Sequence, residues 1–401
     1  MRGGIHMTVN PDQAAERLDR QIRYYLSSGE ISGGEILLLD RERVILHRCY
    51  GEQSIKTHAP ATEKTLYRMM SMTKLVTSLA AARLIERNEL DLDALVSEFL
   101  PSFASVRVAD DPRYVLKKFS IFKLLLLLPM YSDEKVKTTS LRTSLTVKTL
   151  LNHTCGIEEG TVGLLSMQKN QKIYSSLEER AEDYAKGFLS FQPGTKSGYS
   201  PVGGMDVLGV ILGKAANKTP EQVLQDEVIT PLDMPDTGFT PTDPGRVIAL
   251  TKYRKGRPSA DLTGSKSDLP AAVHAKEGVC DCAGGLYGTV SDFGHIAKML
   301  LHDGTYGSGF YLSPETVLMI RTPCAPEQHM KGQRWGLGFA VRESDEVCPD
   351  GCYGWSGAYG THFLIDPENG LALIFAMNRT NIGGARSYIS RELEKRLYDK
   401  E

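Results

Sequence analysis

Ser71-Met72-Thr73-Lys74 opens the stretch SMTKLVTSLAAARLIER, which covers residues 71–87. Apolar side chains recur in it at helical spacing, so we predict a helix from Ser71 to Arg87. Residues three apart share one helix face, and Lys74 Nζ can therefore reach Ser71 Oγ. A serine hydroxyl needs an adjacent base to become a nucleophile, and a lysine acts as that base only when its pKa is depressed. The same four residues also suit an ordinary first helical turn with an exposed lysine.

The composition is typical of a soluble globular chain of 401 residues, with 41% hydrophobic and 24% charged residues. Lys and Arg number 47 against 49 Asp and Glu, which gives a formal net charge of -2. We expect no nucleic-acid partner, because the chain has no basic excess and no basic tail. The start of the chain, up to Gln13, lacks the apolar core of a secretory signal, so we expect a cytoplasmic protein.

Strands and helices at both ends of the chain enclose a mainly helical middle. We predict an amphipathic helix at 13–29, followed by a hairpin of strands 33–39 and 44–46. The later helices are expected at 203–216, 221–229, 290–301 and 386–398. The later strands are expected at 336–341, 362–365 and 371–377. Ser291 is the expected cap of helix 290–301. We therefore predict an α+β fold, in which residues 10–95 and 275–401 form a discontinuous sheet domain. Residues 96–274 form an inserted, mainly helical domain, and the active site lies at the interface.

A leucine-rich segment lies inside the middle block. Leu124 to Leu128 follow a basic flank, within an insertion that spans Arg113 to Thr143. The apolar run is much shorter than the ~20 residues that cross a bilayer, so we expect no integral membrane segment. It fits a buried helix, an apolar flap over a substrate cleft, a partner-binding patch, or a segment that lies on a membrane surface.

Seven cysteines form no dense disulfide framework, and reduced thiols are the expected state. Cys280, Cys282, Cys348 and Cys352 allow a shared metal site as one reading, although closed zinc sites have tighter paired spacing. Small buried residues and loop thiols are the other reading. We predict no metal and no cofactor.

Two further segments supply what a lysine-activated serine requires. Gln192-Pro193-Gly194 leads through a turn to Tyr199 at a loop-to-helix junction, where a hydroxyl can enter a cleft and move a proton. The run from Trp355 to Thr361 is expected to begin a strand. Its small residues let a substrate lie along the backbone, where an N–H can stabilise an oxyanion. Trp355 is a candidate wall of this site, and we expect Ser356, Gly357 and Ala358 to bind the substrate or its oxyanion.

These segments together resemble the serine β-lactamase and penicillin-binding-protein superfamily, in its class C-like branch. That branch includes family VIII carboxylesterases, D-amino-acid-specific peptidases and fungal polyketide acyltransferases. The resemblance runs from Gly33 to Leu397 and rests on ordered motifs: Ser71 to Lys74, Leu150 to Gly156, Phe191 to Thr195, Tyr199-Ser200, Pro231 to Met234 with Thr237 to Phe239, Ala283 to Leu286, Trp335 to Phe339, and Trp355 to Gly357. It implies a β-lactamase/transpeptidase-like fold, an antiparallel sheet flanked by helices.

The resemblance also implies roles for individual residues. Ser71 would be the nucleophile that accepts the acyl group, and Lys74 would be its base or the partner of that base. Tyr199 would exchange protons with the serine and the leaving group. The backbone N–H groups of Ser71 and Ala358 would form the oxyanion hole, and His153 matches a histidine common in the family, which we interpret as structural.

The chain departs from the lactam-cleaving members at two positions. Pro201 occupies the place of an asparagine that helps to bind the lactam side-chain amide. Trp355 occupies the place of a lysine that attracts the substrate carboxylate. Both changes remove polar recognition and suit a neutral, apolar acyl ester.

The main hypothesis is therefore a serine hydrolase that cleaves small carboxylic esters through an acyl-enzyme. The alternatives are acyl transfer to a small-molecule acceptor and weak β-lactamase or D-amino-acid peptidase activity. A binding protein with an idle site and a metallohydrolase are further readings. The sequence does not define the oligomeric state.

Overall fold

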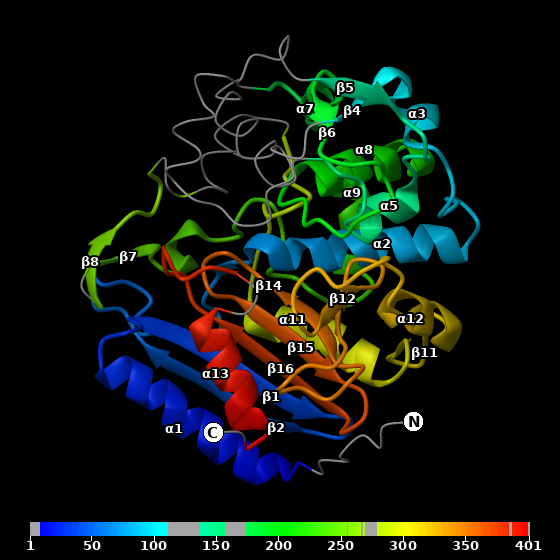
Figure 1. The fold of residues 1–401 in the computed structure, drawn as a ribbon. Helices are drawn as coiled ribbons and strands as arrows, with labels where there is room; N and C mark the ends of the chain where they lie inside the picture. Colours follow the sequence, from blue (N-terminus) through cyan, green and yellow to red (C-terminus); the bar gives the residue numbers. More distant parts are fainter. Residues whose placement is uncertain are drawn as a thin grey trace.

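A seven-stranded antiparallel sheet is built from the two ends of the chain (Figure 1). The computed structural model describes residues 9–110, 137–157, 174–254, 256–265, 268, 279–384 and 387–399. The strands in spatial order are β12 (Gln333–Trp335), β13 (Ala340–Arg342), β14 (Tyr353–Ser356), β15 (His362–Asp366), β16 (Leu371–Ala376), β1 (Gly33–Asp40) and β2 (Val44–Gly51). The first and last parts of the chain thus pair directly, with Glu35 opposite Ala376 and Asp40 opposite Leu371.

Helices cover both faces of this sheet. Helix α11 (Val290–Leu301) packs on one face, while α1 (Pro11–Ser27) and α13 (Tyr388–Leu397) pack together over the other. Because side chains alternate along a strand, each face contributes to a separate core. Trp355 and Phe363 belong to the inner core with α2 and α11, whereas Leu364 belongs to the outer core with α1 and α13. The α+β prediction is confirmed.

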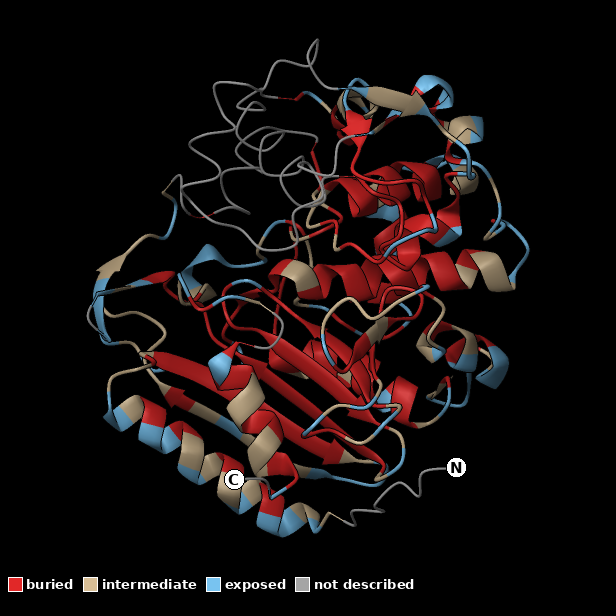
Figure 2. Cartoon of the chain, viewed as in Figure 1, coloured by how far each residue is buried: buried red, intermediate tan, exposed pale blue. Residues whose placement is uncertain are grey.

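Helix α2 (Thr73–Glu86) lies between the sheet and the helices of the middle block (Figure 1). Its sequence is rich in alanine and leucine, which favour helix, and it is apolar around most of its circumference, as expected of a helix buried on all sides. Figure 2 shows burial along almost all of α2. The helices above it are α5 (Val147–Leu151), α7 (Leu177–Ala185), α8 (Gly203–Ala216) and α9 (Pro220–Leu224).

Short elements complete the described fold. The remaining helices are α3 (Val96–Phe99), α12 (Pro314–Arg321), the 3-10 turns η1 (Met70–Met72), η2 (Pro101–Ser105) and η7 (Pro244–Arg246), and the π-helix η6 (Gln225–Ile229). The small sheets are β3 (Tyr67–Arg68) with β9 (Tyr287–Gly288), β5 (Thr138–Ser140) with β4 (Arg107–Ala109) and β6 (Phe188–Leu189), β7 (Thr251–Arg254) with β8 (Arg257–Asp261), and β10 (Thr305–Tyr306) with β11 (Gly309–Phe310).

Three local predictions are wrong. The expected strand 336–341 is mostly the turn between β12 and β13, because Gly338 has a left-handed φ of 84° and faces α2 closely. Trp355 lies near the end of β14 rather than at the start of a strand, since the small residues after Ser356 form the turn to β15. The cap of α11 is Thr289, whose hydroxyl accepts from Asp292 N, and not Ser291.

The division into a sheet domain (10–95 with 275–401) and a helical domain (96–274) stays a prediction. Leu124 to Leu128 and most of the insertion lie outside the described residues, so their predicted roles stay open as well. Among the described residues, every helix is too short or too polar to cross a membrane.

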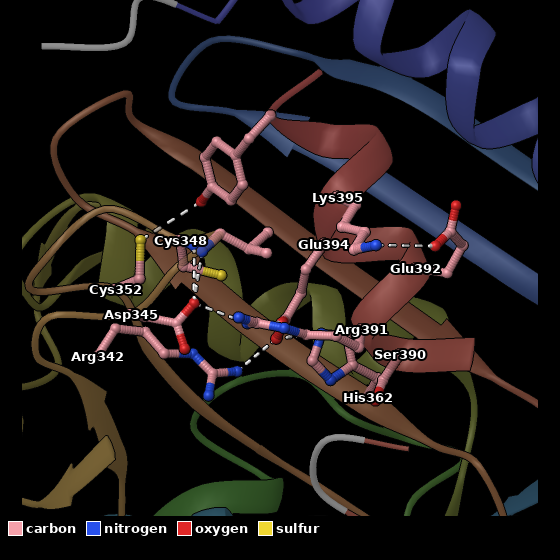
Figure 3. Close-up of polar contacts among 12 residues, drawn as sticks. Arg342, Asp345, Cys348, Cys352, His362, Ser390, Arg391, Glu392, Glu394 and Lys395 are labelled. Atoms are coloured by element: carbon pink, nitrogen blue, oxygen red, sulfur yellow. Dashed lines mark hydrogen bonds and ion pairs between the residues drawn. The ribbon is translucent and has the colours of Figure 1, made fainter. Parts of the chain in front are cut away.

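A buried ionic network attaches α13 to the outer face of the sheet (Figure 3). Glu394, with a side chain 1% exposed, pairs with Arg342 of β13 and with Arg391, which in turn pairs with Asp345 at 2.7 Å. His362 of β15 lies 3.6 Å from Glu394 through Nε2. Removal of one member would leave a buried charge without its counterion, so the network holds α13 in one place.

The burial of His362 beside this network is expected to make stability fall in acid. Burial lowers the pKa of His362 from 6.5 to about 4, with Glu394 acting in the opposite direction and Arg342 in the same direction. Below pH 6.5 the unfolded chain therefore binds a proton that the folded chain resists until about pH 4, and stability is lost across that window. We predict that His362 accounts for a loss of about 2 kcal/mol between pH 7 and 4.5.

The test compares wild type with His362→Asn, which keeps a hydrogen-bond acceptor on β15. Urea unfolding at pH 7 and at pH 4.5 should show a smaller acid loss in the variant, whatever its stability at pH 7. Equal acid losses in the two proteins would contradict the assignment to His362.

Candidate active site

Ser71 lies in the turn that joins β3 to α2. Met70 has a left-handed φ of 50°, which is strained for a residue with a side chain, and Ser71 follows it in η1. Helix α2 then begins at Thr73, so Lys74 stands one turn after Ser71, as predicted. Ser71 is partly exposed, whereas Lys74 is 1% exposed.

The Lys74 ammonium has three acceptors. Nζ donates to Ser71 Oγ at 3.2 Å, to Pro201 O at 2.7 Å and to Ala283 O at 2.8 Å. These acceptors match the three N–H bonds of a lysine ammonium, which satisfies a charged group that is removed from water. The geometry therefore holds Lys74 as a donor to the serine oxygen.

Tyr199 completes a hydrogen-bonded row across the site. Its hydroxyl donates to Ser71 Oγ at 2.8 Å, and the Trp355 indole Nε1–H donates to the Tyr199 oxygen at 3.2 Å. Lys74 Nζ lies 5.2 Å from the centroid of the Tyr199 ring, within range of a cation–π interaction. The structure thus brings Ser71, Lys74, Tyr199 and Trp355 together from segments that are far apart in sequence.

The turn after β14 approaches the nucleophile closely. A side chain on Gly357 would place its Cβ only 2.4 Å from Met69 O, so this position requires glycine. Thr361 Oγ1 also donates to Met69 O at 2.9 Å, which fixes the turn to the chain just before Ser71. Ala358 is exposed in this turn, next to the residues that pack against Met69.

The Ser356 side chain points away from Ser71, toward the opposite face of the sheet. Its Oγ lies 2.8 Å from His362 Nδ1, on the sheet face that α13 covers, and Ser356 is 4% exposed. Strand alternation explains this orientation, because Trp355 faces the row around Ser71 and its neighbour must face the outer core. The expectation of substrate binding by Ser356 is therefore limited to its backbone.

Several groups that contact Tyr199 or Lys74 were not predicted to take part in the site. Trp335 stacks on Tyr199, with ring centroids 5.9 Å apart and planes 7° apart, and the rings of His153 and His329 lie 4.9 and 6.0 Å from that of Tyr199. In the sequence, Trp335 and His153 stand out only as members of motifs. The carbonyls of Pro201 and Ala283 carry no side-chain signal at all.

A tight turn presents the Ala283 carbonyl to Lys74. Asp281 Oδ1 accepts from the N–H groups of Ala283 and Gly284, both at 2.9 Å. Arg180 lies 3.8 Å from the same carboxylate oxygen and pairs with the buried Asp206 of α8. The position of the lysine acceptor thus depends on an ion pair within the helical layer.

The four cysteines considered for a metal do not meet. Cys280 and Cys282 belong to the inner core, and Cys348 and Cys352 to the outer core. A hydrogen bond from the Cys282 thiol to Cys280, together with burial, raises the pKa of Cys282 well above its usual value, so it is a poor source of thiolate. In the described ranges, no three His, Cys, Asp or Glu residues are grouped as metal ligands.

Known proteins are similar to this chain over most of its length. The profile of the Beta-lactamase family matches residues 18–394. Protein Rv1367c of Mycobacterium tuberculosis (strain ATCC 25618 / H37Rv) is 28% identical over 377 residues, which cover 88% of this chain and 87% of that protein. Esterase EstB of Burkholderia gladioli is 25% identical over 398 residues, with coverage of 91% and 90%.

The solved structure of "EstCE1, a hydrolase with promiscuous acyltransferase activity" has the same fold, with a TM-score of 0.78, 23% identity, and coverage of 96% of this chain and 99% of that one. The chain therefore belongs to the Beta-lactamase family, within the serine β-lactamase and penicillin-binding-protein superfamily, and it is a serine hydrolase. The predicted family and fold are confirmed.

The bond from Trp355 to Tyr199 can be tested directly. Trp355→Phe removes the indole N–H, so the Tyr199 oxygen loses the donor that orients it, and we predict that a fluorophosphonate probe labels Ser71 about ten-fold more slowly. Labelling rates are read from fluorescence in gels. Trp335→Phe is the matched control, because its indole nitrogen has no partner among the described residues. Equal losses in the two variants would contradict a role for the Trp355 hydrogen bond.

Proposed function

We propose that this protein cleaves small carboxylic esters through an acyl-enzyme on Ser71, with Lys74 and Tyr199 moving the proton. Three contacts support this proposal: the two hydrogen bonds to Ser71 Oγ and the link from Trp355 to Tyr199. A serine oxygen with two donors on it is oriented for attack, and an adjacent tyrosine hydroxyl can pass a proton on.

The uncharged side chains of Trp355 and Pro201 are the reason for proposing an ester as the substrate. Trp355 places an apolar indole, 5% exposed, where lactam-cleaving members of the superfamily have a lysine. Pro201 contributes only its carbonyl, which Lys74 already occupies. In the described part of the site, the row thus offers neither the asparagine amide nor the lysine that recognise a lactam, so a neutral acyl group fits it best.

The proposed roles define the course of the reaction. Ser71 Oγ bonds to the ester carbonyl carbon, and backbone N–H groups at Ser71 and Ala358 stabilise the resulting oxyanion. The bond from that carbon to the alcohol oxygen then breaks. Tyr199 gives its hydroxyl proton to the departing oxygen, which leaves as an alcohol, and takes the proton of Ser71 in its place, with Lys74 as its partner through the bond to Ser71 Oγ. Water then attacks the acyl carbon and gives one proton to Tyr199, which passes a proton back to Ser71 Oγ, so that the carboxylic acid and free Ser71 are released.

Acyl transfer is the second candidate. An alcohol or amine that enters in place of water would take the acyl group from Ser71 by the same steps. The printed description of EstCE1, a hydrolase with promiscuous acyltransferase activity, favours this alternative. Product formation that rises with added acceptor, while acid release falls, would distinguish transfer from hydrolysis.

The first test replaces the nucleophile. We predict that Ser71→Ala lowers the turnover of p-nitrophenyl butyrate by at least about 10³-fold, because the variant lacks the hydroxyl proposed to accept the acyl group. A chromogenic cephalosporin measured beside it should be turned over far more slowly than the ester by wild type. The readout is the steady-state absorbance of the released chromophore.

Ser78→Ala is the matched control, since it removes a buried hydroxyl from the same helix without contact to Ser71. Ester turnover by Ser71→Ala at the wild-type rate would refute the proposal. Dominant cephalosporin turnover by wild type would replace the ester with a lactam as the preferred substrate.

A further inference from the structure

His153 is a buried imidazole without a hydrogen-bond partner. It follows α5 with a left-handed φ of 53°, is 0% exposed, and neither ring nitrogen bonds to any described residue. Unpaired buried polar atoms and left-handed non-glycine residues are both costly and rare. Among the described residues, the other buried histidine is His362, which differs because its Nδ1 lies 2.8 Å from Ser356 Oγ.

The residue holds the Tyr199 loop at two points. Its carbonyl accepts from Gly198 N at 2.8 Å, which fixes the chain directly before Tyr199. Its ring centroid lies 4.9 Å from that of Tyr199 and 4.2 Å from that of Trp335, at angles of 50° and 54°. His153 therefore packs against the Tyr199 ring and also holds the backbone directly before it.

The imidazole in this place is neutral. Burial, followed by the charges of Lys74 and His329, lowers the pKa of His153 well below its usual value. A neutral imidazole carries one N–H bond. With no oxygen or nitrogen acceptor among the described residues, the acceptors that remain are the aromatic faces of Tyr199 and Trp335, which bind N–H donors weakly.

We propose that His153 is a positioning residue, whose N–H dipole holds the Tyr199 ring and stabilises the negative charge on Tyr199 while its proton moves to the leaving group. This proposal rests on the proposed function and assigns to His153 a role beyond packing. No bond to His153 forms, and no proton leaves it. Dipoles fixed in advance toward developing charge lower the barrier of a reaction in a site shielded from water.

Esters with different leaving groups distinguish this role from a role in packing alone. An alkyl ester releases a strongly basic alkoxide that needs a proton from Tyr199, whereas p-nitrophenolate leaves without one. We predict that His153→Phe, which keeps a ring but has no N–H, lowers kcat/KM for ethyl butyrate about five- to ten-fold. The value for p-nitrophenyl butyrate should fall by no more than about two-fold.

His153→Gln is the second variant, because it restores an N–H at similar reach without a ring. It should recover most of the ethyl butyrate rate that His153→Phe loses. Melting temperatures of all proteins show that each is folded. If the phenylalanine is not tolerated, His153→Leu takes its place as the variant without an N–H.

Equal losses on the two esters, no loss on either, or no recovery in His153→Gln would each overturn the role of the N–H. These outcomes leave the proposed function intact as long as Ser71→Ala is inactive on both esters. Ester turnover that survives Ser71→Ala would instead refute both proposals.

Discussion

The three hydrogen bonds of the Lys74 ammonium are the constraint on which the site depends. They join the start of α2 to the loop before α8 and to the turn before β9, which lie 127 and 209 residues further along the chain. A buried ammonium cannot give up these acceptors without a large cost in desolvation. Both carbonyls are therefore held, and with them the loop that carries Tyr199.

The two cores of the sheet share the task of holding this arrangement. On the inner face, Trp355 ends a row of contacts that begins at Lys74. On the outer face, the next residue, Ser356, meets His362 and the charges beneath α13 (Figure 3). Strand β14 is thus fixed from both sides, and this rigidity suits a turn whose backbone N–H is proposed to meet an oxyanion.

Local periodicity and ordered motifs were enough to predict much of the fold and the central row of the site. Helix α8 and helix α11 begin and end where the periodicity placed them, and Ser71, Lys74 and Tyr199 meet as the family resemblance implied. The prediction of a strand at 336–341 was wrong because the sequence pattern of this glycine-containing run is typical of an extended chain and does not indicate the left-handed φ of Gly338, which makes a turn.

The remaining site could not be read from the sequence for a physical reason. The acceptors on Lys74 are backbone carbonyls, which every residue carries, and their position depends on the tertiary fold. The ring nitrogens of His153 likewise have no hydrogen-bond partner among the described residues, and no sequence pattern predicts this. The direction of Ser356 would have followed from strand alternation, had the end of β14 been placed correctly.

One measurement tests the central claim most directly. Wild type is mixed with excess p-nitrophenyl butyrate, quenched in acid during turnover, digested and analysed by mass spectrometry. We predict a peptide that carries one butyryl group, with fragment ions that place the group on Ser71. A butyryl group on another residue, or none on the protein while ester is being consumed, would contradict an acyl-enzyme on Ser71.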